Sequence, residues 1–179
     1  MLLAALAALP GRTVAESSDS AWAEVDTAAR TLTVYSAYGR RLARYADISI
    51  GSGGAAAVHY RDDHTTPFGN YRIVHIQPSR SFDTFYLLDY PTAEHAEAAT
   101  RSGRLTEEGR DAILAAFEEG QTPPQDTPLG GAIGIHGIGQ GSLEIHKTYN
   151  WTDGCVALTN EQLHDFARYA AVGMRIIIR

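Results

Sequence analysis

The sequence predicts a mainly β fold of the α+β class, in which a curled antiparallel or mixed sheet carries a few helices on its rim. Short segments that alternate apolar and polar residues, rich in β-branched and aromatic side chains, recur along the chain. Helical periodicity is confined to a few stretches. The 179 residues, 44% hydrophobic and 20% charged, suit one globular domain with a sizeable core.

The strands are predicted from alternation and from the turns between them. Thr31 to Tyr35 alternates clearly, and Ala37-Tyr38-Gly39 supplies a turn into a return strand. Gly51 to Gly54 is expected to be a flexible loop, since it lacks the lysine and hydroxyl ending of a phosphate-binding loop. The predicted strands cover residues 23–25, 31–35, 42–50, 71–76, 84–88, 132–136 and 154–158.

Helices are predicted over residues 92–100, 106–119 and 161–171. Thr106 is suited to cap the second, whose first turn carries Glu107 and Glu108 at the positive end of the helix dipole. Thr159 and Gln162 form a capping-box pattern before the third. The proline-rich residues 121–128 must form a loop, so the first two helices are an insertion expected at the rim of the sheet.

Charge and cysteine content narrow the functional classes. A net charge of −6 argues against a nucleic-acid-binding surface. The single cysteine excludes an internal disulfide and is a poor basis for a zinc site. We therefore expect no metal, no cofactor and no nucleic-acid partner.

Within residues 1–21, residues 1–10 are apolar and too short to span a bilayer, and residues 16–20 are polar. Residues 1–10 have the character of a secretory signal without its basic start, and 13–15 or 21–23 could serve as a cleavage site. The alternatives are a helical or disordered extension, or a start codon placed too far downstream. The predicted domain is 22–179, with no stable membrane span and a monomeric state.

Cys155 is the candidate nucleophile. A free thiol near pKa ~8.5 is only slightly ionised at neutral pH, and a nearby imidazole can raise the thiolate fraction. Gly154 precedes it, and together their backbone N–H groups could stabilise an oxyanion. The alternative, a small buried hydrophobic cysteine, is the commoner role of a lone cysteine.

His136 is the candidate general base and acid, because histidine titrates near neutral pH. It ends a predicted strand, where side chains can converge on a cleft. The alternative is a hydrogen-bonded structural histidine.

Several motifs in order resemble the L,D-transpeptidase (YkuD-type) catalytic domain. His136-Gly137 is followed, after about fifteen residues, by Thr152-Asp153-Gly154-Cys155-Val156 and then Asn160. Upstream, residues 63–73 resemble the Asp-x-x-Thr-Pro-x-Gly-x-Tyr-x-Ile stretch of that family, residues 129–137 its strand entering the site, and residues 172–178 its closing strand. The resemblance covers almost the whole of residues 22–179 and implies a sandwich-like, β-rich YkuD fold.

The resemblance implies a bacterial, exported enzyme of the periplasm or cell wall that acts on peptidoglycan stem peptides. Cys155 would form a thioester with the stem peptide and an amine acceptor would resolve it. It also implies that the Gly137 carbonyl orients the His136 imidazole, the role of the third group in a triad. Two alternatives stay open: water resolves the thioester, giving a carboxypeptidase-like or endopeptidase-like hydrolase, or the chain is a catalytically silent wall-binding module.

The chain departs from the family pattern at two positions. Asp153 stands where a histidine is usual, and Ala157 where an arginine is common. The form Trp-Thr-Asp-Gly-Cys resembles a sub-branch related to murein-processing members, some of which cleave. A carboxylate facing the thiol should raise the thiol pKa, so the Asp153 charge is directed elsewhere, holds a cation such as protonated His136, binds a substrate amine, or fixes the loop.

The remaining candidates are supporting residues. Thr152 is expected to make local hydrogen bonds, and Trp151 to pack in the core or flank the substrate. His146 lies in the spacer and could line the cleft. No role is predicted for the other five histidines, which lack metal-site spacing: His59, His64, His75, His95 and His164.

Overall fold

The structure, a computed structural model, describes residues 20–179. The predicted signal segment and the candidate cleavage site at 13–15 lie outside the described residues, whereas Ala21-Trp22-Ala23 enters the first strand. The strands are β1 Trp22–Asp26, β2 Thr31–Tyr35, β3 Arg41–Ala46, β4 Ala55–Ala56, β5 Thr66–Pro67, β6 Gly69–Ser79, β7 Asp83–Leu88, β8 Gly134–Gly137, β9 Val156–Leu158 and β10 Arg175–Ile178. The helices are α1 Ala93–Arg101, α2 Glu107–Glu118, α3 Leu143–Thr148 and α4 Asn160–Phe166.

Eight strands form one mixed sheet in the order β3-β2-β1-β10-β6-β7-β8-β9, confirming the predicted fold class. The sheet curls until its two edges meet. Ser49, which follows β3, pairs with Ala157 of the opposite edge strand β9, and Gly51 pairs with Thr152. This seam brings the chain after β3 against the segment that leads into β9.

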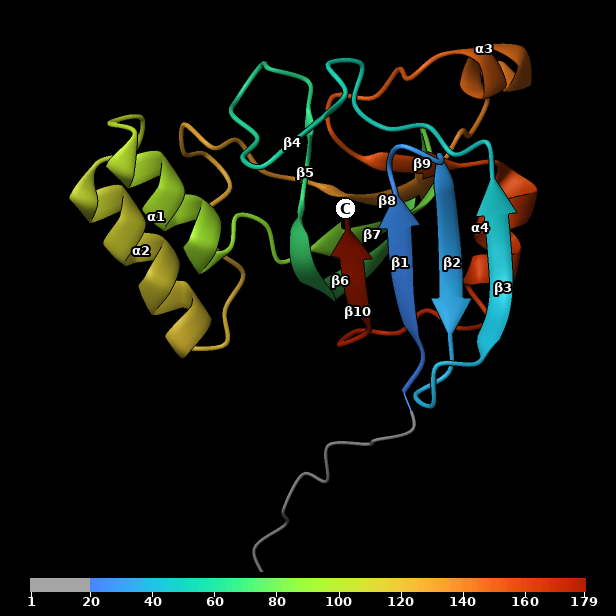
Figure 1. The fold of residues 1–179 in the computed structure, drawn as a ribbon, viewed down its shortest axis with the longest axis horizontal. Coiled ribbons are helices and arrows are strands. Elements are labelled where there is room, and N and C mark those ends of the chain that lie inside the picture. Colours follow the sequence, from blue (N-terminus) through green and yellow to red (C-terminus); the bar gives the residue numbers. More distant parts are fainter. Residues whose placement is uncertain (1–19) are drawn as a thin grey trace, which may run out of the picture.

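The last strand lies in the middle of the sheet (Figure 1). β10 runs parallel to β1 and antiparallel to β6, with Ile176 opposite Ala23 on one side and Tyr71 on the other. It joins the group β3-β2-β1 to the group β6-β7-β8-β9.

The core follows from the alternation seen in the sequence. Ala23 and Val25 of β1 are fully buried, and in β6 it is Tyr71 and Ile73 that point inward. Each fully buried Leu or Ile side chain contributes roughly 1.5–3 kcal/mol through removal of apolar surface from water. Phe166 anchors α4 by edge-on contacts with Tyr45 and Tyr86.

The predicted helix caps are present. The Thr106 hydroxyl accepts from Gly109 N–H at the start of α2, and Thr159 with Gln162 forms the capping box of α4. α1 and α2 form a hairpin to one side of the strands, as expected (Figure 1). His95 fastens α1 to the sheet by hydrogen bonding the carbonyl oxygen of Phe68. Within residues 20–179, no helix is long and apolar enough to cross a bilayer.

Some predicted bounds are wrong. The strand expected over 42–50 ends at Ala46, because Asp47 takes a left-handed backbone conformation (φ 56°) and turns the chain into the seam. The helix expected over 161–171 ends at Phe166 and is followed by turns to residue 170. α3 was not predicted; Ser142 caps this six-residue helix, which is too short for a clear periodic pattern.

Candidate active site

Two neighbouring parallel strands bring the candidate nucleophile and base together. β8 carries His136, and Cys155 immediately precedes β9, whose Ala157 lies beside His136 in the register. Both candidate residues line one cavity of about 330 Å³. Residues 19 positions apart in the chain thus share a cavity because their strands are paired.

The His136 imidazole is buried and fixed in one tautomer. Its Nδ1 donates to the carbonyl oxygen of Gly137 at 2.8 Å, the hydrogen bond that the family resemblance implied. A carbonyl only accepts, so Nδ1 carries the proton and Nε2 is left with a free lone pair. Burial lowers the pKa of His136, partly opposed by the Gly137 hydrogen bond. The ring is therefore neutral at pH 7, the form a general base needs.

Three aromatic rings surround His136. Phe82 packs at 4.4 Å between ring centroids, Phe85 stacks at 6.0 Å, and Trp151 meets it edge-on at 5.8 Å. Since all three also line the cavity, they limit water at the imidazole and hold the ring orientation.

Cys155 is a free cysteine that is partly exposed as a residue, while its thiol is desolvated and protonated at rest. Its Sγ donates to the carbonyl oxygen of Ala132 at 3.3 Å. Burial raises the pKa of Cys155 to about 12, a hydrogen bond with the Gly134 backbone opposes this, and Asp153 raises it further.

The turn before Cys155 positions backbone donors. The Thr152 hydroxyl donates to the Cys155 carbonyl at 2.6 Å and accepts from Gly154 N–H at 3.2 Å. This is the local hydrogen-bonding role predicted for Thr152. Gly154 N–H is thus engaged, whereas among residues 20–179 no backbone acceptor is found for Cys155 N–H. Cys155 N–H is the donor better placed for an oxyanion.

Position 154 requires glycine. Its φ is +135°, and a Cβ there would lie 2.8 Å from both Ile133 Cδ1 and the Thr65 carbonyl oxygen. The Thr65–Thr66 segment thus packs directly against the turn that carries Cys155.

The motif around residue 63 braces that turn. Asp63 accepts from the backbone N–H groups of Tyr60 and Thr65, and so closes its own loop. The buried Thr66 hydroxyl accepts from Gly51 N–H and donates to the Gly154 carbonyl, both at 2.8 Å. One hydroxyl therefore links the seam of the sheet to the turn that holds Cys155.

Asp153 lies on the cavity rim and points to a residue for which the sequence predicted no role. Its Oδ1 is 2.8 Å from Nδ1 of His64. The Asp153 side chain is 91% exposed and that of His64 49%. One oxygen of the Asp153 carboxylate is thus directed to a histidine from another loop, while the carboxylate still lies close enough to raise the pKa of Cys155. The two residues are 89 positions apart, so no local pattern could reveal the pair.

Trp151 connects the buried His146 to His136. Trp151 Nε1 donates to His146 Nδ1 at 3.3 Å while its ring contacts His136. His146 is completely buried and does not line the Cys155 cavity; it reaches the site through Trp151. Burial lowers the pKa of His146 to about 4.

The model of the L,D-transpeptidase catalytic domain (YkuD) matches residues 20–178. The chain belongs to this family. A comparison with curated proteins gives no significant match.

Solved structures show the same fold as this L,D-transpeptidase domain. The helical cell shape determining protein Pgp2 from Campylobacter jejuni aligns at a TM-score of 0.59 and 20% identity over 90% of this chain and 48% of its own. Bd1075 from Bdellovibrio bacteriovorus gives 0.55 and 20% over 92% and 50%. An L,D-transpeptidase from Mycobacterium smegmatis gives 0.53 and 14% over 90% and 59%. The chain thus spans about half the length of these proteins.

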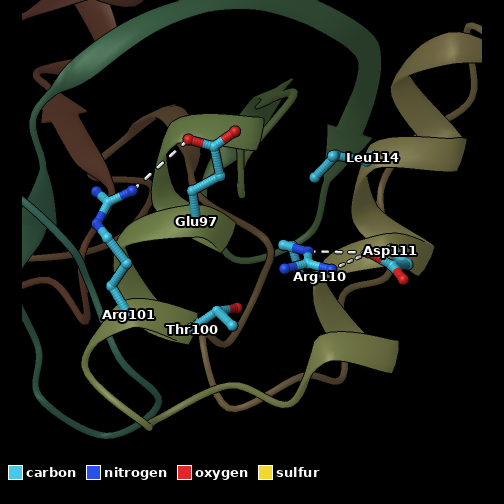
Figure 2. A pocket seen from close by; sticks show the side chains of 6 residues that line it. All are labelled: Glu97, Thr100, Arg101, Arg110, Asp111 and Leu114. Carbon is cyan, nitrogen blue, oxygen red and sulfur yellow. Dashed lines mark hydrogen bonds and ion pairs between the residues drawn. The ribbon is translucent and has the colours of Figure 1, made fainter.

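Two further features bound the site of this L,D-transpeptidase domain. Within residues 20–179, no group of three or more His, Cys, Asp or Glu side chains is arranged to hold a metal ion. A larger cavity of about 440 Å³ lies between α1 and α2, and shares no lining residue with the Cys155 cavity (Figure 2). Its charged side chains pair within their own helices, Arg101 with Glu97 and Arg110 with Asp111.

Proposed function

We propose that the chain is a cysteine-dependent L,D-transpeptidase acting on peptidoglycan stem peptides. Family membership supports an enzyme that acts on peptidoglycan outside the cytoplasm. The observation that carries the finer proposal is the shared cavity, which holds the Cys155 thiol and a neutral His136 with a free Nε2.

The acylation half-reaction follows from this arrangement. The thiol proton passes to His136 Nε2 as sulfur bonds to the scissile carbonyl carbon, and Cys155 N–H stabilises the oxyanion. The C–N bond breaks, and His136 returns the proton to the departing amine. An acceptor amine then attacks the thioester carbonyl carbon and gives its proton to His136. The C–S bond breaks, and His136 passes the proton to the departing sulfur, which restores the thiol.

A high thiol pKa is compatible with this mechanism. A resting thiolate needs no base, whereas a thiol with a pKa of about 12 reacts only when His136 takes its proton. In the proposed mechanism the thiol, which donates to the Ala132 carbonyl at rest, would leave that contact when substrate binds, and this would confine its reactivity to the complex.

Hydrolysis of the same thioester by water is the second candidate. It is favoured by Ala157, a fully buried residue at a position where the family pattern commonly has arginine. A silent wall-binding module is the third possibility, and it has no use for a reactive thiol. The proposed setting is an exported, periplasmic or wall-associated monomer.

The test is mass spectrometry of tetrapeptide-stem muropeptides incubated with the protein in ¹⁸O-water, with Cys155→Ala as control. Unlabelled cross-linked or D-amino-acid-exchanged product supports transpeptidation. A shortened stem carrying ¹⁸O supports the hydrolase. Iodoacetamide labelling at Cys155 is a second measurement; a folded protein with neither product nor labelling contradicts both enzyme proposals.

A further inference from the structure

The cavity that holds Cys155 has a single carboxylate on its rim. Of the ten residues that line it, Asp153 alone carries a formal charge when His136 is neutral. One oxygen of Asp153 is bonded to His64, and no protein partner is found for the other among residues 20–179. The carboxylate is thus oriented by one contact and open to solvent at 91% exposure.

The loop backbone around His64 is ordered by its own hydrogen bonds. Its φ is +55°, a left-handed conformation that a histidine adopts at a cost, and its carbonyl accepts from Gly53 N–H. The flanking residues Asp63 and Thr66 tie the same loop to Tyr60 and to Gly154. The backbone of His64 is therefore fixed relative to the turn that carries Cys155, and its imidazole contacts Asp153 at 2.8 Å.

No cation offsets this carboxylate inside the cavity. None of the lining residues is lysine or arginine. Ala157, where the family pattern commonly has arginine, is fully buried and carries no charge. An anionic substrate group beside the thiol would meet only Asp153, whereas a cationic group would be attracted.

We propose that the His64–Asp153 pair is a binding subsite for a primary ammonium group of the substrate, with Asp153 as the acceptor and His64 as its positioning residue. The inference rests on the proposed function and defines part of its substrate class. The ammonium could belong to the side chain of the diamino acid in the stem peptide, or to the acceptor that resolves the thioester.

Equilibrium binding to the unreactive variant Cys155→Ala distinguishes these sources. The probes are a diaminopimelate-containing tetrapeptide, the same peptide acetylated on its side-chain amine, and free diaminopimelic acid, each titrated by calorimetry. For an exposed ion pair we expect a loss of up to about fivefold in affinity. If the donor peptide supplies the ammonium group, acetylation of the peptide should cause this loss of affinity. If the acceptor supplies it, free diaminopimelic acid should lose this affinity when Asp153→Asn is added to Cys155→Ala.

The double variant Cys155→Ala, Asp153→Asn should bind the free and acetylated peptides equally. For His64, two variants distinguish loss of the hydrogen bond to Asp153 from damage to the loop backbone. Asn tolerates positive φ and keeps a donor at the place of Nδ1, whereas Gly also tolerates positive φ but removes the donor. We expect His64→Asn to preserve the amine preference and His64→Gly to reduce it, with thermal melts confirming folding.

The proposal is overturned if neither the acetylation arm nor the free amine arm depends on Asp153, or if no probe binds. Since Cys155→Ala cannot turn over, this outcome is independent of whether the ¹⁸O experiment yields product. Product formation with no amine preference would leave the enzyme proposal standing and remove the subsite.

Discussion

Replacing Thr66 by valine should destabilise the fold and loosen the nucleophile's turn. Valine keeps the branched shape but removes the hydroxyl that accepts from Gly51 N–H and donates to the Gly154 carbonyl. Thr66 is fully buried, so we expect no water to replace the hydroxyl. An unsatisfied buried donor costs about 1–3 kcal/mol, and the carbonyl loses a hydrogen bond of about 1 kcal/mol.

The sum, about 2–4 kcal/mol, is a large share of the ~5–15 kcal/mol by which domains are stable. For a chain of this size it corresponds to a fall in Tm of about 4–16 °C. The assay is denaturant unfolding of the wild type and Thr66→Val, with iodoacetamide alkylation of Cys155 as a readout of the turn.

Thr65→Val is the matched control, because its hydroxyl donates only to the partly buried Asp63 carboxylate, which keeps two backbone donors. It should cost no more than about 1 kcal/mol. A loss below about 0.5 kcal/mol in Thr66→Val, with unchanged alkylation, would refute the bracing role.

Three other outcomes are expected. Gly154→Ala should lower stability by at least ~1–3 kcal/mol, because of its positive φ and the close carbonyl of Thr65, and a soluble variant with wild-type Tm would contradict the packing. The alkylation rate of Cys155 should rise about tenfold per pH unit from pH 7 to 10, since its pKa is raised to about 12 by burial, and a plateau near pH 8 would show a resting thiolate. The buried neutral His146 should contribute stability that is present above pH ~6.5 and is lost as pH falls toward its lowered pKa of about 4. His146→Gln, which cannot titrate, should therefore lose less unfolding free energy than the wild type between pH 7 and pH 4.5 in urea melts. An equal loss in both proteins would exclude His146 as the source.

Much of the fold could be predicted because its signals are local. Alternation in Thr31–Tyr35 gave the exact bounds of β2, and the caps Thr106 and Thr159 located two helix starts. The end of β3 could not be predicted, because the apolar pattern continues through Ile48 and Ile50 while the backbone turns at Asp47. Ile48 and Ile50 are buried where the two edges of the sheet meet, outside any regular strand.

The candidate site was predictable where the chain motif itself carries the chemistry, as at Cys155 and His136. It was not predictable where partners meet only in three dimensions. His64 reaches Asp153 across 89 residues, and Ala132 accepts from the thiol across 23. Even the Thr-Pro motif gave no hint that its threonine bonds to both Gly51 and Gly154.

The central place of β10 bears on when this domain can fold. The strand that unites the two halves of the sheet, β10, comes last in sequence among the strands of residues 20–179, and its partner β1 comes first, with Trp22 opposite Arg175. Without residues 175–178 the strands of this sheet can pair only in two separate groups, so cooperative folding of the domain waits until β10 has been made. Such a chain stays unfolded for longer, which suits a protein that we propose is exported.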